Sequence, residues 1–134
     1  MTAPARLLRA WRLTDYRIDG FVVRIGRRVP TTLFARLGSR SATLMTAWNP
    51  MSRRRPNGWN SQMQLRLRQH LRRLSSLEAT GRLNQWYEPM LLVGGDPRRI
   101  IRIAARFRQL GVVVLRQGRA AQLFLVRQPA ASPR

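Results

Sequence analysis

Apolar residues recur at helical spacing in three parts of the chain, and the clearest stripe begins at residue 63. Its members are Met63, Leu67, Leu71, Leu74 and Leu77. Steps of three and four residues place them on one helical face, so they predict a long helix from about residue 60 to residue 80 that ends at Gly81.

Two shorter helices follow from start and stop signals. The segment 31–37 begins after Pro30 and ends at Gly38. The segment after Asp96 opens with Pro97, a combination typical of an N-cap followed by the first helical residue. A fourth helix is expected within residues 1–15, where Leu7, Leu8 and Trp11 can share a face.

Runs of β-branched and other apolar residues predict five strands. They cover residues 21–25, 42–47, 85–95, 112–116 and 121–126, and the last two form a hairpin around Gln117–Gly118. The predicted order βαβαβαββ indicates an α/β fold (an α+β sandwich). It would have a single mixed sheet with helices packed on it, right-handed parallel crossovers and a C-terminal antiparallel hairpin.

The length of 134 residues suits one domain, expected over residues 1–127, with residues 128–134 as a disordered tail. No apolar run reaches the length of a transmembrane helix, and the N-terminus lacks the apolar core of a signal peptide. We therefore expect a cytoplasmic protein.

The composition restricts the available chemistry. The chain has no cysteine and one histidine, His70, so cysteine-ligated and multi-histidine metal sites are excluded. Five acidic residues are few for a hard-cation site. No phosphate-binding glycine loop is present either, because "VGGDPRR" lacks the GK[ST] ending. We expect neither a metal nor another cofactor.

The net charge is +21, and all 26 basic residues are arginine. Arginine binds phosphate through two parallel hydrogen bonds and stacks on bases, which indicates a polyanionic partner. Codon bias in a GC-rich genome would explain the choice of arginine over lysine, but it would not explain the scarcity of acids. A basic surface of this kind attracts polyanions in either case.

Specific motifs resemble the bacterial family catalogued as domain of unknown function 3293. They are "TAWNPMS", Asn60 at a helix start, "WYEPM" and "FRQ", within a resemblance that runs from Tyr16 to Leu125. The family pattern has serine where this chain has Met90 and glycine where it has Arg108. The resemblance implies no activity.

Polar residues near two strand ends are candidates for a binding site. In an open parallel sheet, the loops at Trp48–Asn49–Pro50 and at Gly94–Gly95–Asp96 would share one edge, where ligands bind. The candidate ligand-binding residues are Asn49, Ser52, Asn60, Trp86, Glu88 and Gln109. Asparagines beside proline or at helix starts more often satisfy backbone groups, so a structural role for Asn49 and Asn60 is the expected one.

Glu88 is the one acidic residue framed by aromatic and proline neighbours. An apolar setting would raise its pKa and suit it to general acid or base catalysis. With 26 arginines in the chain, a salt bridge is the more common outcome and the one expected here. The sequence leaves open whether the protein is an enzyme, and we expect a binding protein.

The tryptophans and arginines give the leading functional hypothesis. Trp48 and Trp86 are expected in the core, whereas Trp59 follows a basic loop and is either a stacking platform or a hydrophobic staple. The candidate nucleic-acid-binding residues are Arg53, Arg54, Arg55, Trp59, Arg66, Arg73, Arg99, Arg102 and Arg106.

Three functions remain open from the sequence. The first is a non-enzymatic domain that binds nucleic acid, with RNA favoured over DNA. The second is a small-ligand or enzymatic site built from Asn49, Ser52, Asn60 and Glu88. The third is a module whose basic face binds an acidic protein. The sequence does not determine the oligomeric state.

Overall fold

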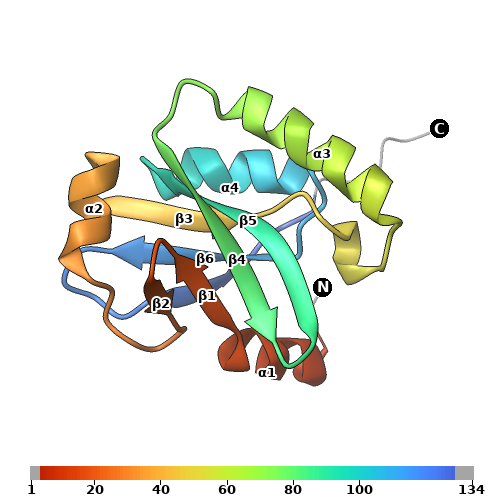
Figure 1. Cartoon of the computed structure of the whole chain (residues 1–134), viewed down its shortest axis with the longest axis horizontal. Coiled ribbons are helices and arrows are strands. Elements are labelled where there is room, and N and C mark those ends of the chain that lie inside the picture. The colour runs from red at the N-terminus through yellow and green to blue at the C-terminus, as the bar shows by residue number, and fades with distance from the viewer. Residues whose placement is uncertain (1–3, 129–134) are drawn as a thin grey trace.

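The computed structural model describes residues 4–128 and contains helices on both sides of one curled antiparallel sheet (Figure 1). The elements in chain order are α1 (Ala5–Leu13), β1 (Asp15–Ile18), β2 (Phe21–Val23), α2 (Thr31–Leu37), β3 (Ser41–Met45), the 3₁₀ turn η1 (Pro50–Ser52), α3 (Asn57–His70), β4 (Ser76–Leu83), β5 (Trp86–Gly94), α4 (Pro97–Arg106), β6 (Gly111–Arg116) and β7 (Gln122–Leu125). None of these described helices is long and apolar enough to span a membrane.

The sheet has seven strands in the order β2-β1-β4-β5-β3-β6-β7, and every neighbouring pair is antiparallel. Two isolated bridges, Ile25 to Ala121 and Arg28 to Ala120, join the chain after β2 to the chain before β7. These bridges bring the two outer edges of the sheet together, so the sheet encloses one of its own faces.

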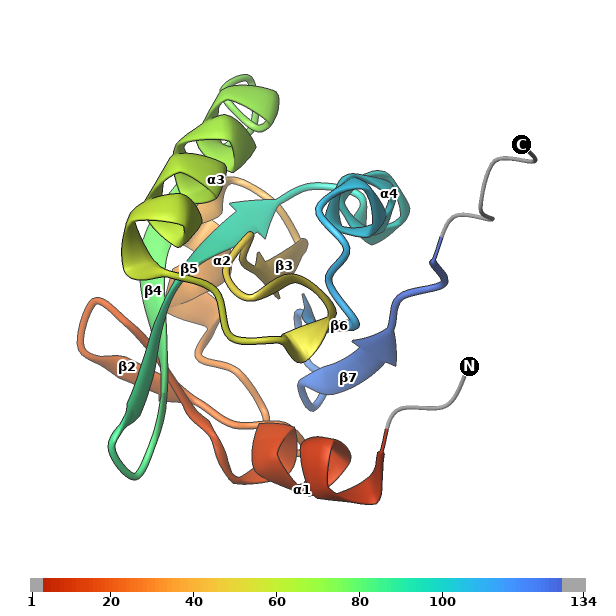
Figure 2. The ribbon, with the colours of Figure 1, turned by 90° about the vertical axis from the view of Figure 1, so that its right-hand side faces the viewer.

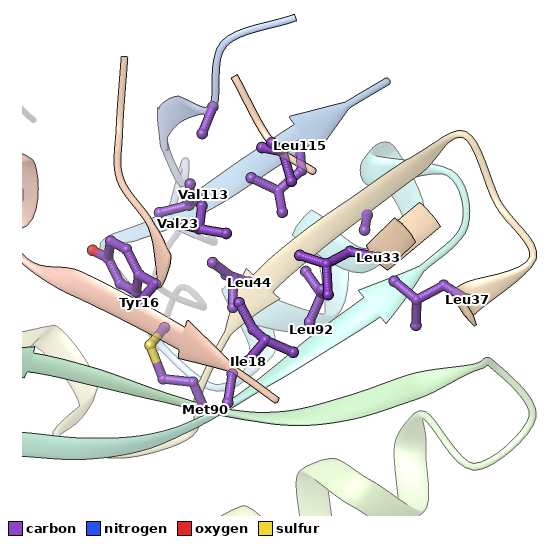
Figure 3. Close-up of a cluster of buried hydrophobic side chains, with 14 of the residues drawn as sticks. Tyr16, Ile18, Val23, Leu33, Leu37, Leu44, Met90, Leu92, Val113 and Leu115 are labelled. Carbon is purple, nitrogen blue, oxygen red and sulfur yellow. The ribbon is translucent and has the colours of Figure 1, made fainter. Parts of the chain in front are cut away.

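Each face of the sheet has its own hydrophobic core. The enclosed face packs Ile18, Leu44 and Leu92 against Leu33 and Leu37 of α2 (Figure 3). The outer face packs against α3 and α4, which lie side by side over it; their buried contacts are Leu67, Leu71, Ile100, Ala104 and Phe107 (Figures 1 and 2). In contrast, α1 lies on the other side of the sheet and contains no fully buried residue (Figure 2).

Several predicted elements are confirmed. The structure contains the helix after Pro30, which ends at Gly38 with a φ of 64°. The N-cap at Asp96 is also present, because its Oδ1 accepts a hydrogen bond of 3.0 Å from the backbone N–H of Arg98. The three central apolar runs form β3, β5 and β6, and β6 pairs with β7 as the predicted hairpin.

The predicted topology is wrong in two respects. There are seven strands instead of about five, and the sheet has no parallel crossover between the named strands of residues 4–128. The loop at Gly94–Gly95–Asp96 therefore lies at the end of the sheet opposite Trp48–Asn49–Pro50, because Gly94 pairs with Ala42 at the start of β3.

The predicted long helix is wrong in its second half. Helix α3 ends at His70, and residues 76–83 form β4, which pairs with β5 along its whole length from Ser76–Val93 to Leu83–Trp86. The helical spacing of Leu74 and Leu77 continues past this boundary, but inward-facing Ala79 and Gly81 follow the two-residue period of a strand. The tight turn at Asn84, with a φ of 54°, closes the hairpin.

Strand β1 was absent from the prediction, and a local signal for it exists. Asp19 and Gly20 both have positive φ angles, 45° and 83°, as a two-residue hairpin turn requires. An Asp-Gly pair between alternating apolar residues is a hairpin signal, so β1 and β2 were predictable from this dipeptide.

Of the predicted tail at residues 128–134, the structure describes Gln128 alone. Its side chain donates a hydrogen bond of 2.9 Å to the backbone oxygen of Gln109, and the rest of the predicted tail lies outside the described residues.

Candidate functional site

A cavity of about 270 Å³ lies between α1 and the end of the enclosed sheet face. Three tryptophans line it, Trp11 from α1, Trp48 after β3 and Trp86 at the start of β5. Its polar lining comes from Tyr16, Glu88, Gln109, Asn49, Ser52, Thr14 and Thr46. The cavity thus combines aromatic walls with a small number of polar groups, the usual composition of a ligand pocket.

Two glycines make room for side chains that line the cavity. Gly81 lies in β4 between Tyr16 on β1 and Glu88 on β5, and it pairs with both. Because Gly81 has no side chain, Met90, Trp86 and Thr14 pack over its Cα; a Cβ there would lie 3.1 Å from the Sδ of Met90. At Gly111 a Cβ would lie 2.9 Å from the Trp11 ring, so this glycine allows the indole of α1 to rest against β6.

Glu88 is buried in this cavity, with 8% of its surface exposed. Burial raises its pKa to about 8, because a carboxylate loses its hydration there. The predicted salt bridge is wrong. All five acids lie within the described residues, and four of them pair with Arg24, Arg36, Arg68 and Arg98, but Glu88 makes no ion pair there. Glu88 therefore carries a proton at neutral pH.

Tyr16 faces Glu88 across Gly81 and remains neutral as well. Burial raises the pKa of its phenol above its usual value, the Thr14 side chain opposes this increase, and the nearby negative form of Glu88 adds to it. Among the residues that line the cavity, Tyr16 and Glu88 are the titratable ones. The cavity is consequently uncharged at neutral pH although the protein carries a large positive charge.

The rim of the cavity is held by an asparagine pair. Asn60 is 1% exposed, and its Oδ1 accepts a hydrogen bond of 3.0 Å from the backbone N–H of Asn49. Its Nδ2 donates to the Oδ1 of Asn49 (2.9 Å) and to the backbone oxygen of Arg55 (3.1 Å). The same Asn49 oxygen accepts from the backbone N–H of Arg55. The structural role expected for these asparagines is confirmed, and it fixes the loop 49–55.

Two glutamines hold the strand that leads into this loop. Gln109 Nε2 donates to the backbone oxygen of Trp48 at 3.1 Å, and Gln64 Oε1 accepts from the backbone N–H of Ala47 at 2.9 Å. The Thr46 hydroxyl donates to the backbone oxygen of Pro89 at 2.7 Å, which ties the end of β3 to β5. The segment carrying Trp48 is therefore anchored from α3, from β5 and from the residues after α4.

An open depression adjoins the cavity on its outer side. The two share Trp48, Asn49, Ser52 and Trp86 as lining residues. The depression adds two arginines and further polar and aromatic side chains; these are Arg54, Arg55, Asn57, Asn60, Gln85 and Tyr87. None of the described residues that line it is acidic. It therefore joins positive charge to aromatic surface at the mouth of the cavity.

The aromatic residues around this depression are accessible. Trp86 and Trp59 are each 40% exposed and Tyr87 is 54% exposed. The guanidinium of Arg55 lies over the Trp59 ring, 5.4 Å from its centroid. The expectation that Trp86 belongs to the core is wrong, because Trp86 sits at the start of β5, where the hairpin of β4 and β5 projects beyond the core. Trp59 is an exposed side chain held by a cation–π contact.

The structure divides the predicted nucleic-acid-binding arginines into two groups. Arg53, Arg54 and Arg55 are exposed on the loop beside the cavity. The others are exposed on the layer of α3 and α4 or just after α3; they are Arg66, Arg73, Arg99, Arg102 and Arg106. Helix α4 starts after the Gly94 end of β5, so Arg99 lies at the end of β5 opposite Trp86.

The structure brings the predicted ligand-binding residues together. Asn49, Ser52, Trp86, Glu88 and Gln109 all line the cavity, and Asn60 lines the adjoining depression. The predicted reason for their proximity, parallel strand ends, is wrong: the end of β3 and the start of β5 meet because these strands are antiparallel. Sequence analysis missed Trp11 and Tyr16, and no local pattern marks either as part of a site.

The two departures from the family pattern have structural consequences. Met90 is buried and forms part of the cavity floor. Arg108 follows α4 with a φ of 55°, a left-handed conformation that favours glycine, and its backbone oxygen accepts a hydrogen bond of 2.7 Å from Met51. Glycine would therefore fit the backbone at position 108 better than arginine does.

Replacing Arg108 with glycine is expected to stabilise the protein by about 0.5–1 kcal/mol. The relief of left-handed strain, roughly 1–2 kcal/mol, exceeds the extra backbone entropy of glycine in the unfolded chain. Urea unfolding measures the difference. The matched control is Arg102→Gly, an exposed position within α4, which should destabilise by about 1 kcal/mol. A loss of stability in both variants would contradict this account of position 108.

The described residues 4–128 contain no group of three or more histidine, cysteine or acidic side chains placed to hold a metal ion. The chemistry of the site therefore rests on Glu88, Tyr16, the amide side chains and the arginines at the mouth.

Comparison with protein families identifies the family to which the chain belongs. The model of the family described as protein of unknown function (DUF3293) matches residues 45–112. The chain belongs to this family. Comparison with curated proteins and with solved structures found no match.

The DUF3293 match is shorter than the resemblance from Tyr16 to Leu125, but it contains all six candidate ligand-binding residues. It runs from the end of β3 to the start of β6 and includes the loop of Arg53–Arg55. Trp11 and Tyr16, which complete the cavity from α1 and β1, lie outside it.

Proposed function

We propose that this DUF3293 protein is a non-enzymatic binding protein for single-stranded nucleic acid, with RNA as the favoured partner. The observation that carries this proposal is the depression at the mouth of the cavity, where Arg54 and Arg55 stand beside Trp86 and Tyr87. Proteins that bind single strands combine a positive groove for the backbone with aromatic side chains on which bases stack. RNA is favoured because unpaired, accessible bases are mainly a feature of RNA loops and ends.

The charge distribution supports the same partner. Four of the five acids are occupied by arginines at the surface, and the fifth, Glu88, is buried and protonated. The positive charge around the depression is thus not offset locally. The arginines of the α3 and α4 layer add general attraction for phosphates, which steers a strand to the protein without fixing its position.

The test compares two double variants that remove the same charge. Fluorescence anisotropy with a single-stranded RNA dodecamer measures the dissociation constant between 50 and 300 mM salt. Arg54→Ala with Arg55→Ala should weaken binding about tenfold or more at 100 mM salt and lower the salt slope by roughly 1.4, since single strands give about 0.7 per phosphate contact. Arg99→Ala with Arg102→Ala is the control and should have a clearly smaller effect.

Equal losses in the two variants would show that attraction is spread over the surface and would reject the depression as the binding site. A single-stranded DNA dodecamer of the same sequence tests the preference for RNA. Retention of an acidic protein after nuclease treatment, without binding to either oligonucleotide, would replace the proposal with a protein partner.

A second candidate, a small-ligand or enzymatic site, is favoured by the cavity itself. A protonated Glu88 within an aromatic enclosure is suited to donate a proton or a hydrogen bond to a small substrate. This candidate requires a small molecule to bind in the cavity when no nucleic-acid strand is present.

A further inference from the structure

The cavity and the outer depression form one continuous surface, but the residues that line them differ in charge. The depression presents Arg54 and Arg55, whereas the cavity is aromatic and has no arginine among its described lining residues. Trp86 lines both, so its indole stands at the passage from one to the other. A ligand that occupied both would have an anionic part outside and a flat, uncharged part inside.

The cavity dimensions suit a single heterocycle. Its volume of about 270 Å³ is just below the roughly 300–1,000 Å³ of pockets that hold drug-sized molecules. Trp11, Trp48 and Trp86 form walls against which a ring can stack, and the hydrogen bond from Gln109 to its backbone oxygen holds the Trp48 segment. Aromatic walls of this kind bind planar rings, and every nucleobase has a face that can stack.

Glu88 supplies the hydrogen-bonding pattern that a base requires. A protonated carboxyl group has one donor and one acceptor side by side. The pairing edge of each nucleobase likewise offers a donor next to an acceptor, either a ring nitrogen beside an amino group or an N–H beside a carbonyl. No arginine of the described residues 4–128 pairs with Glu88 and occupies its oxygens, and Glu88 lines the cavity rather than the outer surface.

We propose that the cavity beneath α1 accepts one unstacked base of the bound RNA, that Glu88 hydrogen-bonds its pairing edge, and that the adjoining phosphates lie on Arg54 and Arg55. This inference rests on the proposed function, because it takes the strand in the outer depression as given. A single strand lowers the cost of inserting a base, because no base pair has to be broken. The protein then reads the base in the cavity and the backbone in the depression.

The first experiment separates the contribution of the bases to the binding affinity from that of the phosphate backbone. Anisotropy is measured with an adenosine dodecamer and with a dodecamer of tetrahydrofuran abasic analogues that carries the same phosphate charge. The adenosine strand should bind at least tenfold more tightly, as stacking and hydrogen bonding of a base predict. Equal affinities would overturn both the insertion of a base and the stacking of bases on Trp86 and Tyr87, and would leave only the phosphate contacts of Arg54 and Arg55. If neither strand binds, the proposed function itself fails.

Two substitutions test the role of Glu88. Glu88→Leu fills the position with an apolar side chain of similar size, and it should lower the affinity for the adenosine strand about tenfold while leaving the abasic strand unchanged. Glu88→Gln keeps a neutral donor and acceptor, and it should bind the adenosine strand within about threefold of the wild type at pH 7. An unchanged affinity in Glu88→Leu would overturn the role of Glu88.

The pH dependence gives an independent readout. Above pH 8 the wild-type affinity for the adenosine strand should fall, approaching tenfold per pH unit, because binding requires the neutral carboxyl group. Glu88→Gln should show no such fall between pH 7 and 9. The other titratable group in the cavity, Tyr16, has a pKa raised above its usual value and stays neutral over this range. Identical profiles for the two proteins would contradict the proposal.

A competition experiment identifies the source of the base. Free adenosine monophosphate offers the same base and one phosphate but no strand. It should compete at least a hundredfold more weakly than the dodecamer, because it reaches fewer arginines. Competition as strong as that of the dodecamer would overturn the RNA partner and assign the site to a free nucleotide.

Discussion

Replacing Glu88 with glutamine is expected to remove most of the pH dependence of stability between pH 5 and 8. In the wild type, the folded-state pKa of Glu88 is about 8 and its ordinary value is 4.5. Between these two values the folded protein holds a proton that the unfolded chain has lost, so the free energy of unfolding falls as pH rises. The slope approaches 1.4 kcal/mol per pH unit and the total is roughly 4–5 kcal/mol.

Urea unfolding followed by tryptophan fluorescence, repeated from pH 5 to pH 9, measures this effect. The Glu88→Gln variant should have a flatter profile and exceed the wild type by several kcal/mol at pH 9, where the wild type must bury a carboxylate. Glu78→Gln is the matched control, because Glu78 is exposed and paired with Arg68; its profile should follow the wild type. Parallel profiles for Glu88→Gln and the wild type would show that Glu88 is hydrated.

Replacing Trp11 with alanine is expected to detach α1 from the sheet and lower the free energy of unfolding by about 2–3 kcal/mol. Helix α1 has nine residues and none is fully buried, so its docking depends on few contacts. The indole of Trp11 rests against Gly111, close enough that a Cβ there would overlap it. The expected loss is below the roughly 3–5 kcal/mol typical of a tryptophan buried in a core, since Trp11 is half-buried.

Hydrogen exchange distinguishes detachment of α1 from general destabilisation. In Trp11→Ala, the amides of residues 5–13 should exchange nearly as fast as in an unfolded peptide, because short helices are marginal without packing. The amides of β3 and β5 should keep their protection. Arg9→Ala, an exposed change in the same helix, is the control and should leave α1 protected. Protection of α1 in Trp11→Ala would contradict the anchoring role of the indole.

Elements with local signals were predictable from the sequence. The helix ended by Gly38, the helix capped by Asp96 and the hairpin of β6 and β7 each depend on residues within a few positions of one another. The order of strands in the sheet depends on pairing between distant segments. It brings β4 between β1 and β5, and the helical spacing that continues through Leu77 concealed that strand.

The candidate site could likewise be predicted only in part from the sequence. Asn49, Ser52, Trp86, Glu88 and Gln109 were identified as polar or aromatic residues near strand and helix ends, and they do converge. The state of Glu88 was not predictable, because it depends on Gly81 and Tyr16 from two other strands and on the cover that α1 provides. Composition favoured a salt bridge, whereas no arginine within residues 4–128 lines the cavity.

Glu88 is expected to be a neutral carboxyl group within the cavity at physiological pH, and carbon-13 NMR measures its protonation state. In protein labelled at the glutamate side-chain carboxyl carbons, the chain gives two resonances, from Glu78 and Glu88, and the Glu88→Gln variant assigns them. The Glu88 resonance should titrate with a midpoint near pH 8. A midpoint near the ordinary value of about 4.5 would contradict it, since the carboxyl group would then be hydrated and charged.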